Sequence, residues 1–90
     1  MILDTKTIQR IKQIPIEQVL YTVKFRHIGD KLASRCIFHN EKKASFYVYL
    51  KTNSWFCFGG CHEGGDVIKL IQKLSDINFV DACNYLKKYL

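Results

Sequence analysis

Four residues with the chemistry of metal ligands stand in two close pairs near the middle of the chain. Cys36 and His39 are separated by two residues, and Cys57 and Cys61 are separated by three. Thiolates and imidazole nitrogens are donors that zinc prefers, and a structural zinc ion is held by four of them in a tetrahedron. The short spacing within each pair lets both side chains reach one ion. The sequence therefore predicts one zinc site with the ligands Cys36, His39, Cys57 and Cys61.

The predicted site is structural rather than catalytic, because four protein ligands leave no position for water or substrate. Metal binding is then coupled to folding. Two alternatives stay open on the residues alone: a disulfide between Cys36 and Cys57, and His62 as a ligand in place of His39. The N-terminal segment lacks the basic and apolar pattern of a signal peptide, so we expect a cytoplasmic, reducing location. There, clustered Cys and His more often bind metal than form disulfides.

The segments that must position these ligands read as strands. Between residues 21 and 58 the hydrophobic pattern takes the period of two that is typical of β-structure. In the clearest strand, Phe46 and Val48 point to one face, while Tyr47, Tyr49 and Lys51 point to the other. The strands best marked by this pattern are 31–35, 45–51 and 54–58. They predict an antiparallel sheet of about three to five strands.

Helical spacing appears on both sides of the sheet region. At the N-terminal side, Ile8, Ile11 and Ile14 recur at helical intervals until Pro15 interrupts them, and a second short helix is predicted over 16–20. Asp4 or Thr5 is the N-cap candidate of the first helix. Two further helices are predicted near the C-terminus, with Asp66 and Asn78 as their N-cap candidates. Cys83 lies on the apolar face of the last predicted helix, where it reads as a buried small hydrophobic residue.

Length and charge limit the class of protein. The chain has 90 residues, 14 Lys and Arg against 8 Asp and Glu, and a formal net charge of +6. We expect one domain over 1–90, of the small α+β class: a zinc ribbon with an antiparallel sheet flanked by N- and C-terminal helices. Nothing in the sequence has the length of a membrane span, the pattern of a phosphate-binding loop or paired catalytic carboxylates. We therefore expect no membrane association and no enzymatic activity from this chain alone.

Two segments resemble the N-terminal zinc-binding domain of bacterial, DnaG-like DNA primases. The family pattern C-P-F-H-x-E-K-T-P-S-F corresponds to Cys36-Ile37-Phe38-His39-Asn40-Glu41-Lys42-Lys43-Ala44-Ser45-Phe46. The family pattern C-F-G-C, followed by G-G-D and a helix, corresponds to Cys57-Phe58-Gly59-Gly60-Cys61-His62-Glu63-Gly64-Gly65-Asp66. The differences are Ile37 for Pro, Lys43-Ala44 for Thr-Pro, and one extra glycine in the second ligand pair. They predict a divergent member, from a mobile element or a small standalone protein, or a piece of a longer primase.

The resemblance implies a function in DNA replication. The family module binds one structural zinc ion, recognises the single-stranded template and supports RNA primer initiation within the primosome. It works with a polymerase domain, sometimes supplied by another chain, and that catalytic domain lies downstream of the module in the family. The implied partners are single-stranded DNA and a primase polymerase domain or replicative helicase.

The residues of the predicted sheet are consistent with binding to single-stranded DNA. Aromatic side chains on a sheet face can stack bases, while Lys and Arg contact phosphates. The predicted nucleic-acid-binding residues are Arg26, Lys31, Arg35, Lys42, Lys43, Tyr47, Tyr49, Lys51 and Trp55, with Phe56 as the alternative to Trp55 on its strand. A second hypothesis is a structural zinc domain that mainly contacts a polymerase domain or helicase. It predicts zinc binding without affinity for single-stranded DNA.

Overall fold

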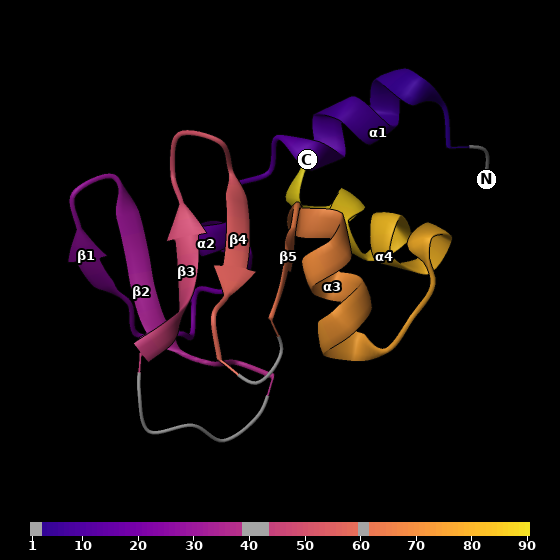
Figure 1. Ribbon diagram of the computed structural model, residues 1–90. Helices are drawn as coiled ribbons and strands as arrows, with labels where there is room; N and C mark the ends of the chain where they lie inside the picture. The colour runs from indigo at the N-terminus through magenta and orange to yellow at the C-terminus, as the bar shows by residue number, and fades with distance from the viewer. Residues whose placement is uncertain (1–2, 39–43, 60–61) are drawn as a thin grey trace.

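The computed structural model describes residues 3–38, 44–59 and 62–90. Helices stand at both ends of the chain and strands between them (Figure 1). The elements are α1 (Thr5–Lys12), α2 (Ile16–Val19), β1 (Arg26–Ile28), β2 (Lys31–Arg35), β3 (Ala44–Tyr49), β4 (Ser54–Cys57), β5 (Glu63–Gly65), α3 (Val67–Ser75), α4 (Phe79–Leu86) and the 3₁₀ helix η1 (Lys87–Tyr89). This arrangement confirms the predicted α+β class.

The strands form one antiparallel sheet in the order β1-β2-β3-β4-β5, so each strand pairs with the next one along the chain. The predicted strands 31–35, 45–51 and 54–58 correspond to β2, β3 and β4. Strand β5 was not among the strands predicted from the sequence, because its Gly64-Gly65 pair reads as a turn. It pairs with β4 through Trp55↔Gly65 and Cys57↔Glu63.

Side-chain caps begin three of the helices, as the sequence predicts. Asp4 Oδ1 accepts a hydrogen bond from the Thr7 N–H at the start of α1. Asp66 does the same for the Lys69 N–H in α3, and Asn78 for the Asp81 N–H in α4. Each cap satisfies an N–H group that the first helical turn leaves without an intrahelical acceptor, and is worth about 1 kcal/mol.

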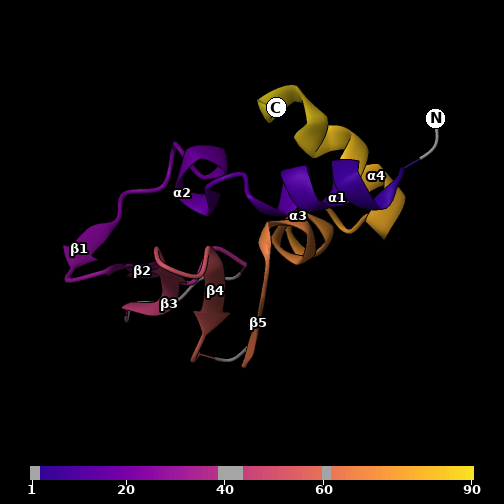
Figure 2. The ribbon, with the colours of Figure 1, turned by 90° about the horizontal axis from the view of Figure 1, so that it is seen from above.

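The core lies between one face of the sheet and the helices. Figure 2 shows α1 and α2 on one side of the sheet, with α3 and α4 packed beyond β5. The core residues with the largest fully buried side chains are Trp55, Phe46, Ile11, Ile16, Ile68, Leu70 and Leu86. Cys83 is buried in this core, as predicted. In the described ranges, no helix combines the length and the apolar character that crossing a bilayer requires.

Two side chains of the β3–β4 region join the sheet to the helices. Asn53, in the turn between β3 and β4, donates through Nδ2 to the carbonyl oxygens of Lys12 and Ile14 at 3.0 and 2.7 Å. Its Oδ1 accepts from the Ile16 N–H at 3.0 Å. Trp55 Nε1 donates to the Asp66 carbonyl oxygen at 2.8 Å, which ties β4 to the start of α3. These bonds fix the junction of α1 and α2, and the start of α3, against the sheet.

Candidate metal centre and nucleic-acid interface

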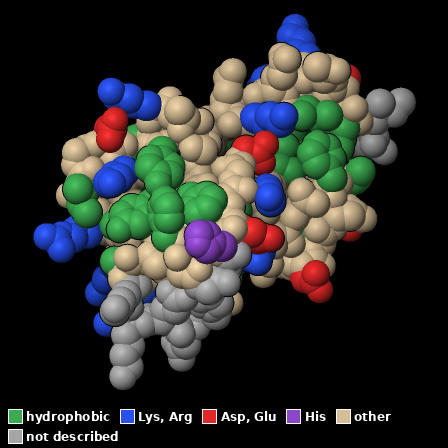
Figure 3. All heavy atoms as spheres, viewed as in Figure 1, with side chains coloured by type: hydrophobic (Ala, Val, Ile, Leu, Met, Phe, Trp, Pro, Cys, Tyr) green, Lys and Arg blue, Asp and Glu red, His purple; other side chains and the backbone are tan. Residues whose placement is uncertain are grey.

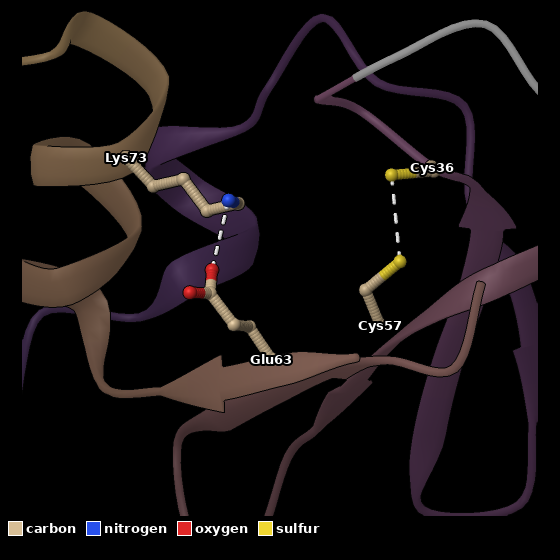
Figure 4. Close-up of polar contacts among 4 residues, drawn as sticks. All are labelled: Cys36, Cys57, Glu63 and Lys73. Atoms are coloured by element: carbon tan, nitrogen blue, oxygen red, sulfur yellow. Dashed lines mark hydrogen bonds and ion pairs between the residues drawn. The ribbon is translucent and has the colours of Figure 1, made fainter. Parts of the chain in front are cut away.

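Two predicted zinc ligands meet in the described part of the chain. Cys36 directly follows β2, and Cys57 is the last residue of β4. Both are buried, and their Sγ atoms lie 3.4 Å apart. Figure 4 shows the two sulfurs pointing toward one another from their separate segments. The sheet thus brings together one member of each predicted ligand pair, although β3 lies between β2 and β4.

The separation of the two sulfurs distinguishes between the chemistries left open by the sequence. A disulfide requires the two sulfurs to be about 2.05 Å apart, and the observed 3.4 Å is far longer, so the structure does not join Cys36 and Cys57 in a disulfide. Two sulfurs that each lie about 2.3 Å from a tetrahedral zinc ion are about 3.8 Å apart. The pair therefore fits two thiolates that share one metal ion.

The other two predicted ligands, His39 and Cys61, lie outside the described residues. Within the described ranges, no cluster of three or more His, Cys, Asp or Glu side chains surrounds one point. Ser45 lies beside the pair, with its Oγ 4.0 Å from Cys57 Sγ. A hydroxyl at this position can hydrogen-bond to a thiolate, the kind of outer contact that orients metal ligands.

The position of His62 bears on the alternative ligand set. Its ring packs edge-on against Phe56, with 6.0 Å between the ring centroids. Phe56 and Cys57 are adjacent in β4, so their side chains point to opposite faces of the sheet. His62 therefore lies with the face opposite to that of Cys57. This favours His39 over His62 as the fourth ligand.

The sheet face that points away from α1 and α2 is here called the outer face. Residues directly opposite each other in antiparallel strands share a face. By this register the outer face carries Arg26 and Ile28 of β1, Lys31 and Ala33 of β2, Tyr47 and Tyr49 of β3, Ser54 and Phe56 of β4, and Gly64 of β5. Figure 3 shows hydrophobic side chains gathered over the strands, with a histidine at one end of the patch and Lys and Arg side chains around it.

Aromatic rings dominate the centre of the outer face. Phe58, 53% exposed, packs against the rings of Phe56 and Tyr47, with centroid separations of 4.6 and 5.7 Å. Lys31 Nζ lies 5.1 Å from the centroid of the Tyr47 ring. A surface pocket of about 450 Å³ opens beside these rings and is lined by Lys31, Ala44, Ser45, Tyr47, Tyr49, Phe58 and Gly59. The pocket therefore combines aromatic walls with a cation.

The structure brings several of the predicted nucleic-acid-binding residues together. Those that share the outer face are Arg26, Lys31, Tyr47 and Tyr49. Arg35 is exposed at the end of β2, where the β2–β3 register shifts. Lys51 follows β3 in the turn, where its Nζ lies 3.6 Å from Asp30 Oδ2, and its side chain is 81% exposed. Lys42 and Lys43 lie outside the described residues.

The prediction that Trp55 lies on the aromatic outer face is wrong. Trp55 is 2% exposed and stands opposite Val48 on the inner face, where its ring stacks on Phe46. A large apolar ring gains more by burial in the core than by exposure, and its N–H finds an acceptor there. Phe56, its neighbour in β4, takes the outer position. Phe58 was not predicted as an outer-face residue. Its position two residues after Phe56 in the same alternation would have indicated that it shares the face of Phe56.

Gly64 supports the position of Phe56 on the outer face. A Cβ atom at Gly64 would stand 2.5 Å from Phe56 Cδ2 and 2.5 Å from the Trp55 carbonyl oxygen. Gly64→Ala is therefore expected to displace Phe56 and strain the β4–β5 pairing, at a cost of about 1–3 kcal/mol. A thermal melt of the zinc-loaded protein measures this loss.

Gly29→Ala is the matched control for Gly64→Ala. Gly29 has a φ of +61° but nothing within 4 Å of its added Cβ. Its cost is therefore limited to left-handed backbone strain of about 1 kcal/mol. Equal melting temperatures for Gly64→Ala and the unmodified protein would contradict the close contact with Phe56.

Comparison with known proteins assigns this chain to a family. The model of the CHC2 zinc finger of DnaG matches residues 3–90. The chain belongs to the CHC2 zinc finger family. The resemblance to the DnaG-like primase zinc-binding domain is thereby confirmed. The family description implies zinc binding, which agrees with the approach of Cys36 to Cys57.

Individual relatives of this CHC2 zinc finger are DNA primases. It is 43% identical to a DNA primase of Mycobacterium leprae over 77 residues, covering 83% of this chain and 12% of the primase. It is 34% identical to a DNA primase of Clostridium acetobutylicum over 88 residues, covering 96% of this chain and 15% of that protein. The chain thus spans a small part of the length of the curated relatives that it matches.

A solved structure shares the fold of this CHC2 zinc finger. The crystal structure of the Aquifex aeolicus primase, which comprises zinc-binding and RNA polymerase domains, superposes with a TM-score of 0.81 at 29% identity. The superposition covers 97% of this chain and 22% of the Aquifex chain. This chain therefore corresponds to only a small part of that two-domain protein.

Proposed function

We propose that this chain is the zinc-binding module of a DNA primase that binds the single-stranded template and supports the initiation of RNA primers. The observation that carries the proposal is the outer face, where Tyr47, Phe56 and Phe58 form a continuous aromatic surface beside Lys31. Residues 1–90 act as one domain in this proposal. Primer synthesis itself belongs to a polymerase domain.

The outer face offers two kinds of contact with a DNA strand. The faces of unpaired bases stack on aromatic rings, at about 1–3 kcal/mol for each base. Arg26 and Lys31 lie on the same face, and Arg35 is exposed at the end of β2, so all three provide cations for the phosphates. The phosphate contacts supply affinity, whereas contacts with base edges in the pocket beside Tyr47 and Phe58 supply preference for one template sequence.

The proposed metal centre contains one zinc ion with Cys36, His39, Cys57 and Cys61 as its ligands. The metal would supply a structural cross-link, because all four positions are filled by protein. The Sγ atoms of Cys36, which follows β2, and Cys57, at the end of β4, lie 3.4 Å apart. Their approach keeps the three central strands aligned, and with them the rings of the outer face.

The polymerase domain is the proposed protein partner. The relatives of this chain are DNA primases, of which it covers only 10–15% of the length. The Aquifex aeolicus structure contains an RNA polymerase domain in addition to the zinc-binding domain. We infer that a polymerase domain, in the same chain or another one, receives the template held by this module. A replicative helicase is the further partner that the same role in the primosome would require.

Tyr47→Ala is expected to weaken binding of single-stranded DNA by about 5- to 150-fold, because it removes one stacking ring. Arg35→Glu is expected to weaken binding as well, and to lower the dependence of affinity on salt concentration. Fluorescence anisotropy with a labelled oligonucleotide, at two or more salt concentrations, measures both effects on the zinc-loaded protein.

Tyr85→Ala is the matched control. Tyr85 on α4 also has a lysine over its ring, with Lys88 Nζ 3.9 Å from the centroid, but it lies off the sheet. The control variant is expected to bind DNA as the unmodified protein does. Zinc-loaded protein without affinity for single-stranded DNA, or equal losses for Tyr47→Ala and Tyr85→Ala, would contradict the proposed interface.

A further inference from the structure

Lys73 of α3 contacts at once two different segments that adjoin the two buried cysteines. Its Nζ lies 2.8 Å from Glu63 Oε2 in β5. The same Nζ lies 5.0 Å from the centroid of the Phe38 ring, within the range of a cation–π interaction. Figure 4 shows the Glu63–Lys73 ion pair beside the Cys36–Cys57 pair. The side chains of Lys73 and Glu63 are 31% and 43% exposed, so water screens this contact only in part.

The two partners of Lys73 belong to the two segments that carry the cysteines. Phe38 stands two residues after Cys36 and packs edge-on against Phe46 and at a tilt against Trp55, in the core. Glu63 stands directly opposite Cys57 in the β4–β5 register. One ammonium group therefore connects the segment after β2 with the strand that pairs with β4. The sulfurs of Cys36 and Cys57, carried by these same two segments, lie 3.4 Å apart.

The charge of Lys73 also has the sign that the proposed metal centre requires. A zinc ion bound by three thiolates and one neutral imidazole carries a net negative charge. A nearby ammonium stabilises that charge, and the ammonium itself is held in place by Glu63 and Phe38. Outer contacts of this kind set ligand orientation and metal affinity.

We propose that Lys73 is a positioning residue of the zinc centre, which raises zinc affinity by fixing the Phe38 and Glu63 segments around Cys36 and Cys57. This inference rests on the proposed zinc ligation. It assigns a role in metal binding to a helix that supplies none of the proposed ligands. The rest of α3 is held by Val67, Ile68, Leu70 and Ile71, which are buried in the core, so the helix does not need Lys73 to stay in place.

The test compares Lys73→Met with Lys69→Met in the full chain. Lys69 lies one turn earlier on α3 and lines the same surface groove, of about 580 Å³, but makes no ion pair with any described residue. Zinc affinity is measured by competition with a chromogenic chelator. Lys73→Met is expected to lower it by about 10-fold, as loss of an outer contact typically does. Lys69→Met is expected to stay within about 2-fold of the unmodified chain, since Lys69 forms no ion pair with the described residues that Met would remove.

Two further measurements separate positioning of the metal centre from general stability. Lys73→Arg keeps the positive charge and is expected to retain most of the zinc affinity that Lys73→Met loses. With Co²⁺ in place of zinc, Lys73→Met is expected to move the thiolate-to-metal charge-transfer band to longer wavelength, because loss of the ammonium raises the energy of the sulfur electrons. If the unmodified chain binds zinc and Lys73→Met binds it equally well, the inference is overturned while the metal centre stands. If the unmodified chain binds no zinc, the metal centre itself is overturned.

Discussion

Cys57→Ser is expected to abolish stoichiometric zinc binding and to remove the cooperative thermal transition of the chain. Cys57 is fully buried and its sulfur lies 3.4 Å from that of Cys36, so a hydroxyl there replaces one of two adjoining thiolate donors. Structural zinc contributes about 10–16 kcal/mol to the folding of zinc-finger peptides. That contribution is as large as the whole free energy of unfolding of a typical domain, about 5–15 kcal/mol. Metal content per chain and circular dichroism on heating measure the two effects.

Cys83→Ala is the control for the loss of a buried cysteine. Cys83 lies in α4 within the apolar core, and its substitution is expected to leave one zinc ion per chain and a cooperative melt.

Substitution of the two candidate histidines tests the fourth ligand. His39→Ala is expected to lose zinc and His62→Ala to keep it, because His62 packs on the outer face against Phe56. A Cys57→Ser protein that retained one zinc per chain would refute the proposed ligand set.

Asn53→Ala is expected to produce the second largest loss of stability. The Asn53 side chain donates to the Lys12 and Ile14 carbonyl oxygens and accepts from the Ile16 N–H, so its removal leaves three backbone groups without this partner. We expect a cost of about 2–4 kcal/mol in the free energy of unfolding, which is a drop of roughly 10–20 °C in Tm for a domain of this size. A thermal melt of the zinc-loaded protein at fixed zinc concentration measures it.

Asn53→Gly separates the side chain from the backbone. Asn53 has a φ of +49°, a left-handed conformation that glycine adopts without strain and alanine does not. The glycine variant is therefore expected to lose the hydrogen bonds but to save about 1 kcal/mol of strain relative to alanine. If both variants have the same Tm as the unmodified protein, the side chain of Asn53 does not hold α1 and α2 to the sheet.

Much of the architecture could be predicted from the sequence because its signals are local. The alternation of Phe46 and Val48 with Tyr47 and Tyr49 specifies a strand and its two faces, and the structure buries the first pair. Pro15 marks the junction between the first two helices, and it is the N-cap of α2. The spacing of the ligand pairs predicted the approach of Cys36 to Cys57, since both fall at strand ends of one sheet.

The features that the sequence did not reveal depend on contacts between distant segments. Strand β5 contains two glycines, which read as a turn until Phe56 is seen to lie against Gly64. Trp55 and Phe56 are adjacent aromatic residues, and only the register with Val48 decides which one enters the core. The hydrogen bonds of Asn53 cross about 40 positions of the sequence, at separations of 37, 39 and 41. No periodicity predicts contacts at such distances.

The order of the strands has a consequence for how the chain assembles. Because every strand pairs with the next one along the chain, each step of sheet formation closes a single short loop, and the entropy lost at each closure is small. The contacts of α1 with α3 and α4 are different, because they join the two ends of the chain. A meander of hairpins can thus form early from local contacts, whereas docking of the N-terminal helix completes the core late. The segments that carry Cys36 and Cys57 belong to the early part, so the metal can be captured before the helices close over the sheet.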